Sequence, residues 1–149
     1  MSALQIMPDM LPDRLEAGTQ NAPGIAGLLQ GIRFVKEKGQ ENILRHEQEL
    51  QEAAARGLEK IPGIQVFHTE KPGVQSGVLS FRIEGKDCRD VGEELSSRQI
   101  AVRTGLHCAP LAHRSAGTHE TGTVRLSFSI FNTPAQVEQF LKVIQQSVP

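Results

Sequence analysis

The part of this sequence from which the rest can be interpreted is the segment Ile100-Ala-Val-Arg-Thr-Gly-Leu-His-Cys-Ala-Pro-Leu-Ala-His113. It begins with an apolar run that predicts a short strand, Ile100–Val102. Gly105 then permits a turn that a β-branched residue would not tolerate, and Pro110 prevents a strand from continuing beyond the turn. The sequence therefore predicts a loop that presents a histidine and a cysteine side by side at a strand end.

These two residues are His107 and Cys108, and the cysteine has the neighbours of a reactive thiol. Imidazole and guanidinium groups favour the thiolate, which is the nucleophilic form of cysteine. Most cysteines are instead small buried apolar residues, but the polar neighbours His107 and Arg103 favour a nucleophile at Cys108. The second cysteine, Cys88, lies in a predicted helical turn without a histidine beside it, and we expect it to be structural.

Length and composition indicate a soluble domain of ordinary size. The chain has 149 residues, 38% of them hydrophobic, which is enough for a core. Its 16 basic and 17 acidic residues give a net charge of −1, so we expect no nucleic-acid partner, which would require a basic surface. No apolar run approaches the roughly 18 residues of a membrane span, and Met1–Asp13 does not resemble a signal peptide. We expect a cytoplasmic protein with free thiols and no membrane association.

The remaining pattern predicts a fold of helices and strands. Residues 1–20 contain two prolines and little periodicity, and we interpret them as an arm or linker. The order of the later elements, α-α-β-β-α-β-β-α, is typical of an α+β layer with helices packed on a mainly antiparallel sheet. The predicted helices begin near residues 21, 40, 87 and 134, and Asn21 is the expected N-cap of the first. The predicted strands are 64–68, 78–83, 100–103 and 123–129, and in 78–83 the alternation places Leu79, Phe81 and Ile83 on one face.

Arg125 is the second candidate functional residue. Val124, Leu126 and Phe128 alternate along the predicted strand 123–129, so Arg125 should point away from the core. An arginine fixed on a strand can bind a carboxylate through two parallel hydrogen bonds. A surface arginine without a role is the alternative, but the presence of a candidate nucleophile at Cys108 favours the carboxylate site.

The sequence also contains two weaker candidates. Cys108, His113 and His119 have the spacing C-x4-H-x5-H, but structural zinc usually requires two tight pairs of ligands, and we expect no metal site. The polar run 16–21, just before a predicted helix, could offer a hydroxyl group and backbone amides to a phosphate.

Three blocks of the sequence together resemble the C-terminal part of the class V aminotransferase family, and in particular its cysteine desulfurases and selenocysteine lyase-like members. These blocks span 14–27, 100–113 and 122–133, and their order and spacing also match. The resemblance covers the chain from about residue 12. It implies that 21–149 form the small C-terminal domain of a fold-type I enzyme, and that 1–20 are an arm or linker from its large domain.

The resemblance also implies roles for individual residues. Cys108 corresponds to the cysteine that accepts sulfur, and Arg125 to the arginine that holds the substrate carboxylate. Arg103 lines the cysteine loop, where His107 would also face the substrate. The implied reaction converts L-cysteine to L-alanine and leaves a persulfide on Cys108, from which a sulfur-acceptor protein takes the sulfur.

Pyridoxal 5′-phosphate (PLP) and a homodimer are implied as well. Thr19, with Gly18 beside it, would contact the cofactor phosphate of the partner subunit. The lysine that holds PLP in this family lies in a preceding large domain, and no matching segment occurs here. We therefore expect the chain alone to be inactive and not to bind PLP covalently, whether it is a fragment of a longer enzyme or a stand-alone small domain.

Two other functions remain open from the sequence. One is an enzyme of the same family that acts on another amino acid, in which Cys108 is incidental. The other is a solitary non-enzymatic domain that carries sulfur or binds a partner protein.

Overall fold

A computed structural model describes residues 9–148 of the chain except 17, 70 and 72. Its internal contacts divide the chain after Gly39 into two compact units, which are described separately. The division into an arm or linker, 1–20, and a small C-terminal domain, 21–149, is implied by the family resemblance. It stays a prediction. None of the helices in the described part of the chain is long and apolar enough to cross a membrane.

The first unit contains helix α1 (Ala22–Lys38). Asn21 is its N-cap, as predicted, because the side chain accepts a hydrogen bond of 3.0 Å from the backbone N–H of Gly24. The helix ends at Gly39, whose φ of 81° suits glycine. None of the residues of α1 is buried within the unit.

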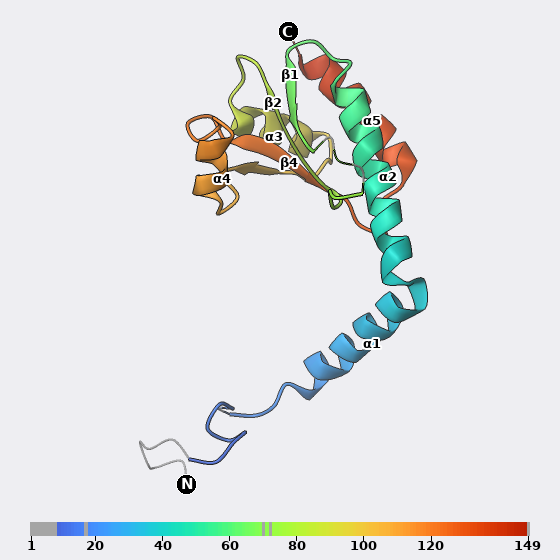
Figure 1. Cartoon of the computed structure of the whole chain (residues 1–149), viewed down its shortest axis with the longest axis vertical. Helices are drawn as coiled ribbons and strands as arrows, with labels where there is room; N and C mark the ends of the chain where they lie inside the picture. The colour runs from blue at the N-terminus through green and yellow to red at the C-terminus, as the bar shows by residue number, and fades with distance from the viewer. Residues whose placement is uncertain (1–8, 17, 70, 72, 149) are drawn as a thin grey trace. The chain divides into compact units, whose positions relative to one another are not determined.

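The second unit is built on an antiparallel sheet whose described strands follow the order β1-β2-β4-β3. In Figure 1 helices α2 and α5 run along one side of this sheet, and α4 lies at the other side. This arrangement confirms the predicted α+β class. The strands are β1 (Ile64–Phe67), β2 (Val78–Ile83), β3 (Arg103–Gly105) and β4 (Thr123–Ser127), and the helices are α2 (Gln40–Leu58), α3 (Cys88–Ser97), α4 (Pro110–Ser115) and α5 (Pro134–Ser147).

One face of the sheet forms the core with α2, α3 and α5. Along β2 the side chains of Leu79, Phe81 and Ile83 are buried, whereas Ser80 between them is only partly buried. Phe81 meets Phe140 of α5 edge to face, with the ring centroids 5.8 Å apart. The alternation predicted from the sequence is therefore confirmed, and it leaves the side chains of the intervening residues on the opposite face of the sheet.

Two predictions for the middle of the chain were wrong. The strand begins at Arg103 and not at Ile100, because the backbone N–H of Ile100 donates to the carbonyl of Leu95 at 2.9 Å and so belongs to the end of α3. The predicted order of elements also omitted helix α4, which begins at Pro110, where the missing N–H of proline needs no partner. The observed order is α-α-β-β-α-β-α-β-α.

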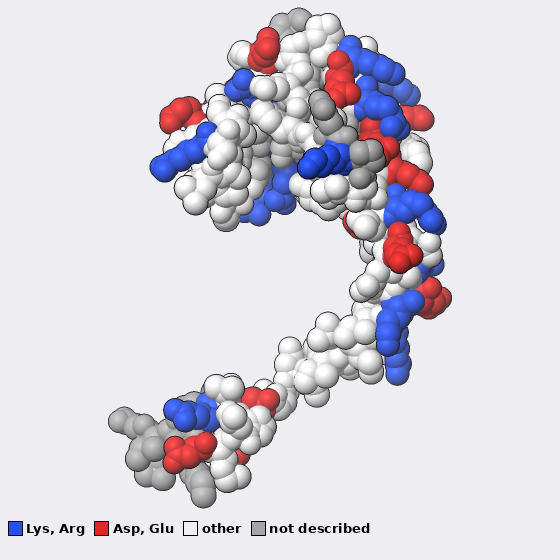
Figure 2. All heavy atoms as spheres, viewed as in Figure 1, with Lys and Arg blue, Asp and Glu red and all other residues white. Residues whose placement is uncertain are grey.

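Charged side chains are interspersed on the molecular surface. Figure 2 shows that Lys and Arg alternate with Asp and Glu along α2, without a large area of one sign on the face in view. Within α2, Arg56 and Glu52 form an ion pair of 3.2 Å one helical turn apart. This mixed pattern agrees with the near-zero net charge of −1.

Candidate functional site

The sheet face opposite the core carries a row of polar side chains. Arg125 of β4 is paired directly with Ser80 of β2 on one side and with Arg103 of β3 on the other. Residues directly opposite each other in an antiparallel sheet project from the same face. The sequence predicted that Arg125 points away from the core, and the register adds that Arg103 is its immediate neighbour.

The two arginines are not neutralised within the described residues. Neither takes part in any of the ion pairs found there. The Nε atom of Arg125 is buried and makes no hydrogen bond in the described structure. Like charges placed opposite each other destabilise a sheet, and a buried donor without a partner costs about 1–3 kcal/mol. An anion bound beside Arg103 and Arg125 would relieve the repulsion between the two guanidinium groups.

Cys108 lies in a tight turn after β3. The backbone N–H of Ala109 donates to the carbonyl of Leu106 at 2.8 Å, and the two central residues, His107 and Cys108, have φ values of 52° and 61°. Two positive φ values are typical of a type I′ turn, in which glycine or asparagine is usual. The histidine and the cysteine are thus held in a conformation that is costly for their residue types. The sequence predicted a turn but placed it at Gly105, which is the last residue of β3.

The turn brings its side chains to the arginines and to β4. Nη2 of Arg103 donates to Sγ of Cys108 at 3.9 Å, and this thiol is exposed. Nε2 of His107 lies 3.2 Å from Oγ1 of Thr123, while Nδ1 is buried and has no hydrogen-bond partner in the described structure. Burial lowers the pKa of His107, and the positive charge of Arg125 lowers it further, so both effects favour the neutral ring.

A second histidine packs against the first. The rings of His113 and His107 have centroids 5.7 Å apart, and Nδ1 of His113 lies 2.8 Å from Oγ1 of the buried Thr118. His119 contacts Glu120 instead. His113 and His119, two of the three residues with zinc-ligand spacing, therefore contact other side chains. The described residues contain no group of three or more His, Cys, Asp or Glu side chains that could hold a metal ion.

Sequence analysis did not identify Ser80, Thr123 or His113 as part of this site. Ser80 and Thr123 occupy alternating polar positions next to buried residues, which is a weak signal because such positions are usually solvated. The sequence indicates His113 only as a candidate metal ligand. Gly18 and Thr19, the predicted phosphate contacts, are exposed residues of the first unit, and their role stays a prediction.

The two thiols should differ in reactivity. Cys108 is exposed, whereas Cys88 is only 7% exposed as the first residue of α3. We expect limited alkylation at neutral pH to modify Cys108 first, and peptide mapping by mass spectrometry measures the order. In urea both thiols should react at similar rates. Equal labelling of the two cysteines in the folded chain would show that the Cys108 turn does not present its thiol as described.

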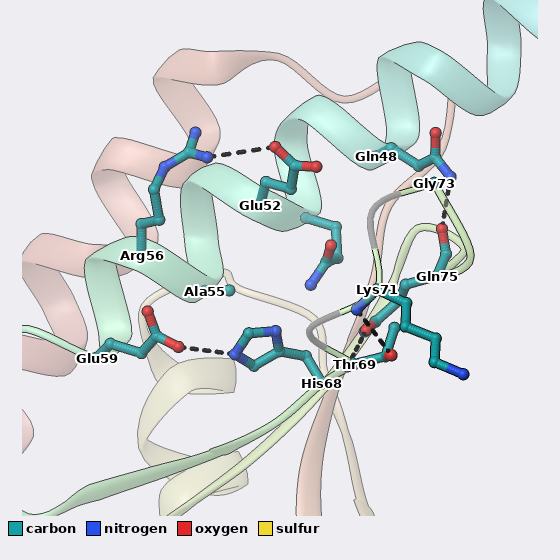
Figure 3. A pocket seen from close by; sticks show the side chains of 11 residues that line it. Gln48, Glu52, Ala55, Arg56, Glu59, His68, Thr69, Lys71, Gly73 and Gln75 are labelled. Carbon is teal, nitrogen blue, oxygen red and sulfur yellow. Dashed lines mark hydrogen bonds and ion pairs between the residues drawn. The ribbon is translucent and has the colours of Figure 1, made fainter.

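A separate cleft lies between α2 and the loop that follows β1 (Figure 3). Its polar groups mainly bind one another: Glu59 lies 2.7 Å from Nε2 of His68, and Nε2 of Gln48 donates to the carbonyl of Gln75 at 2.7 Å. His68 is thus paired with Glu59. No residue of the Cys108 turn lines this cleft, and we assign no function to it.

Comparisons with known proteins identify the class to which this fold and site belong. Residues 4–140 match the model of the aminotransferase class-V family, and the chain belongs to that family. The resemblance stated from the three sequence blocks is confirmed.

The similar proteins within the family are cysteine desulfurases. A probable cysteine desulfurase of Mycolicibacterium paratuberculosis is 37% identical over 135 residues, which are 91% of this chain and 19% of that protein. Another, from Pyrococcus abyssi, is 35% identical over 138 residues, 92% of this chain and 33% of that protein. The solved apo structure of the cysteine desulfurase from Thermococcus onnurineus NA1 has a TM-score of 0.84 and 36% identity, and the match covers 92% of this chain and 34% of that one. The chain therefore spans no more than about a third of the length of these relatives.

Proposed function

We propose that this chain supplies the sulfur-accepting and carboxylate-binding side of a PLP-dependent cysteine desulfurase that converts L-cysteine to L-alanine. The observation that carries the proposal is a pair of arginines that have no anionic partner among the described residues, one of which donates to an exposed thiol in a strained turn. Such a site has one place for a carboxylate and one nucleophile beside it. An amino acid whose side chain ends in sulfur fits both.

Binding of the substrate carboxylate is the proposed role of Arg125. Arg125 is a half-buried residue of a central strand, and its planar guanidinium group is preorganised for a carboxylate, so less side-chain entropy is lost for each hydrogen bond formed. A charge-assisted hydrogen-bonded contact of this kind contributes roughly 1.5–3 kcal/mol. Arg103, on the adjacent strand, adds a second positive charge and reaches Sγ of Cys108, which ties the carboxylate site to the nucleophile.

Sulfur transfer is the proposed role of Cys108. Its thiolate attacks the sulfur of the bound L-cysteine, so that a sulfur–sulfur bond forms and the carbon–sulfur bond of the substrate breaks. The electron pair of the broken bond stays with the carbon fragment, which takes up a proton and leaves as L-alanine. The products are L-alanine and a persulfide on Cys108. The exposure of this residue supports delivery of the sulfur to an acceptor protein.

PLP supplies an electron sink that allows the carbon–sulfur bond to break. The residues of the site fit the substrate of such chemistry. Segment 103–125 contains no lysine, so the amine that holds the cofactor would come from outside this segment. Gly18 and Thr19 are the proposed contacts to the cofactor phosphate. We further propose that 21–149 form the small domain and 1–20 its arm or linker, and that the assembled enzyme is a cytoplasmic homodimer.

A chimera tests this function. In it, the chain replaces the matching third of the Thermococcus onnurineus cysteine desulfurase, which has the same fold over this region. We expect the purified chimera to produce L-alanine from L-cysteine and to carry a persulfide on Cys108, detected by mass spectrometry. The chain alone, mixed with PLP and treated with borohydride, should show no stoichiometric adduct on a lysine. A folded, PLP-loaded chimera that forms no alanine would contradict the proposal.

A further inference from the structure

Helix α4 directly follows the Cys108 turn and contributes a single buried side chain to the domain. Of its six residues, Pro110–Ser115, five are exposed, and only His113 is buried, at 8% exposed. None of the hydrophobic core residues found in the described structure belongs to this helix. The position of α4 beside the turn therefore depends on His113, to which neither the family resemblance nor the comparisons give a role.

His113 contacts the turn at two points. Its backbone N–H donates to the carbonyl of Ala109 at 3.1 Å, and Ala109 itself closes the turn by donating to the carbonyl of Leu106. The ring of His113 packs against the ring of His107, with centroids 5.7 Å apart and an angle of 45° between the planes. The two contacts involve the residues immediately before and after Cys108, so the nucleophile lies between them.

The side chain of His113 is held in turn by Thr118. Nδ1 of the ring lies 2.8 Å from Oγ1 of Thr118, which is 1% exposed, and the backbone N–H of Thr118 donates to the carbonyl of His113 at 2.8 Å. The side-chain contact forms with either tautomer of the ring, because a hydroxyl group can donate or accept. The carbonyl of Thr118 accepts from the backbone N–H of Gly122 at 2.8 Å, immediately before β4 begins. A series of contacts thus connects the turn to an interior strand of the sheet.

We propose that His113 is a positioning residue that holds the turn of His107 and Cys108 in its strained conformation. The φ values of 52° and 61° are costly for these residue types, and such a conformation persists only where its surroundings enforce it. The hydrogen bond from Arg103 to Cys108 is long, at 3.9 Å. The contact of His107 with Thr123, at 3.2 Å, lies at the upper end of the usual range. The packing of α4 supplies the additional restraint.

The consequence for catalysis rests on the proposed function. Arg125 lies on β4 and would bind the substrate carboxylate without help from α4. The turn would place the thiol against the substrate sulfur, and a misplacement of about 1 Å can slow a reaction roughly 100-fold. In the chimera, His113→Ala should therefore lower kcat for alanine formation by about 10- to 100-fold and change KM by less than about twofold.

The turn can be measured in the 149-residue chain without cofactor or substrate. Backbone couplings from NMR report the sign of φ at 107 and 108, and hydrogen exchange of the Ala109 amide reports whether the turn is closed. We expect two positive φ values in the wild type. In His113→Ala these values should average toward the negative region, and the Ala109 amide should exchange about tenfold faster, because the ring contact and the contact with Thr118 are lost together.

His119→Ala is the matched control, because this histidine is in the same loop region but contacts Glu120 instead of the turn. It should leave the φ values, the exchange of the Ala109 amide and kcat unchanged. Thr118→Val keeps the shape of the side chain but removes the hydroxyl group, and should produce a smaller change in the same direction as His113→Ala. This variant decides the test if His113→Ala does not fold.

Two results would overturn the proposal. One is a folded His113→Ala variant whose φ values and Ala109 exchange equal those of the wild type. The other is an equal loss of exchange protection at Ala109 and along β2, which would show that His113 stabilises the whole domain and not the turn. An inactive wild-type chimera, together with the expected response of the turn in the chain, would reject the desulfurase function and leave the positioning role of His113 standing.

Discussion

Replacing Cys108 with serine should abolish persulfide formation in the chimera while leaving the fold and the substrate site in place. A serine oxygen cannot form the sulfur–sulfur bond and is a weak nucleophile without an adjacent base to activate it. The side chain is exposed, so the substitution removes no core contact, and serine tolerates the turn as well as cysteine does. We therefore expect alanine formation from L-cysteine to fall to background, as measured by amino-acid analysis, with no persulfide detected by mass spectrometry.

The matched control is Cys88→Ala, which removes the other thiol. Cys88 is buried against the core, so this change should lower stability but should leave sulfur transfer by the folded protein intact. Alanine formation that survives Cys108→Ser would show that Cys108 is incidental. It would favour the alternative that this family member is a lyase or aminotransferase acting by another route.

Replacing Arg125 with alanine should weaken capture of L-cysteine by about 10- to 150-fold, which corresponds to the roughly 1.5–3 kcal/mol of a charge-assisted hydrogen bond. Stability should not fall by more than about 0.5 kcal/mol, because Arg125 points away from the core and makes no ion pair in the described structure, and because the substitution also removes an unpaired buried N–H and the repulsion with Arg103. Arg125→Lys should recover only part of the affinity, since an ammonium group is a point charge and not a planar fork. The measurements are the L-cysteine dependence of alanine formation by the chimera, and melting curves.

Arg82→Ala provides the control for Arg125. Arg82 lies on the same face of the sheet, two residues from Ser80 on β2, but it is paired with Gln65 and not with an arginine. Its loss should leave substrate capture unchanged. If Arg125→Ala lowers the melting temperature sharply while the folded fraction keeps its activity, Arg125 is structural and the carboxylate assignment is wrong.

The sequence predicted the outline of this fold because most elements carry a strong local signal. The alternation of Leu79, Phe81 and Ile83 and the capping of α1 by Asn21 are examples, and both agree with the structure. The third strand was predicted to begin too early because the apolar side chain of Ile100 was interpreted as part of a strand. In the structure Ile100 packs against the core just after α3. Helix α4 was missed because it spans only Pro110–Ser115, too short for a periodic pattern.

The site could be predicted only in part, for a related reason. Reactive residue types such as Cys108 and Arg125 are visible in a sequence, and their roles here stay predictions. Their geometry depends on strand register, which brings Arg103 opposite Arg125 although 21 residues separate them in the chain. Local spacing holds no information about that pairing. The contact of Thr123 with His107 likewise arises from the pairing of β3 with β4.

The turn at His107 and Cys108 has a consequence for protein engineering. Both residues occupy the left-handed region of the backbone map, where glycine or asparagine would fold at lower cost. A redesign that selects variants by thermal stability alone would therefore favour replacing the two side chains on which the proposed chemistry depends. A screen of this protein for stabilised variants needs to hold positions 107 and 108 fixed, since the gain in stability there would be obtained at the expense of the nucleophile.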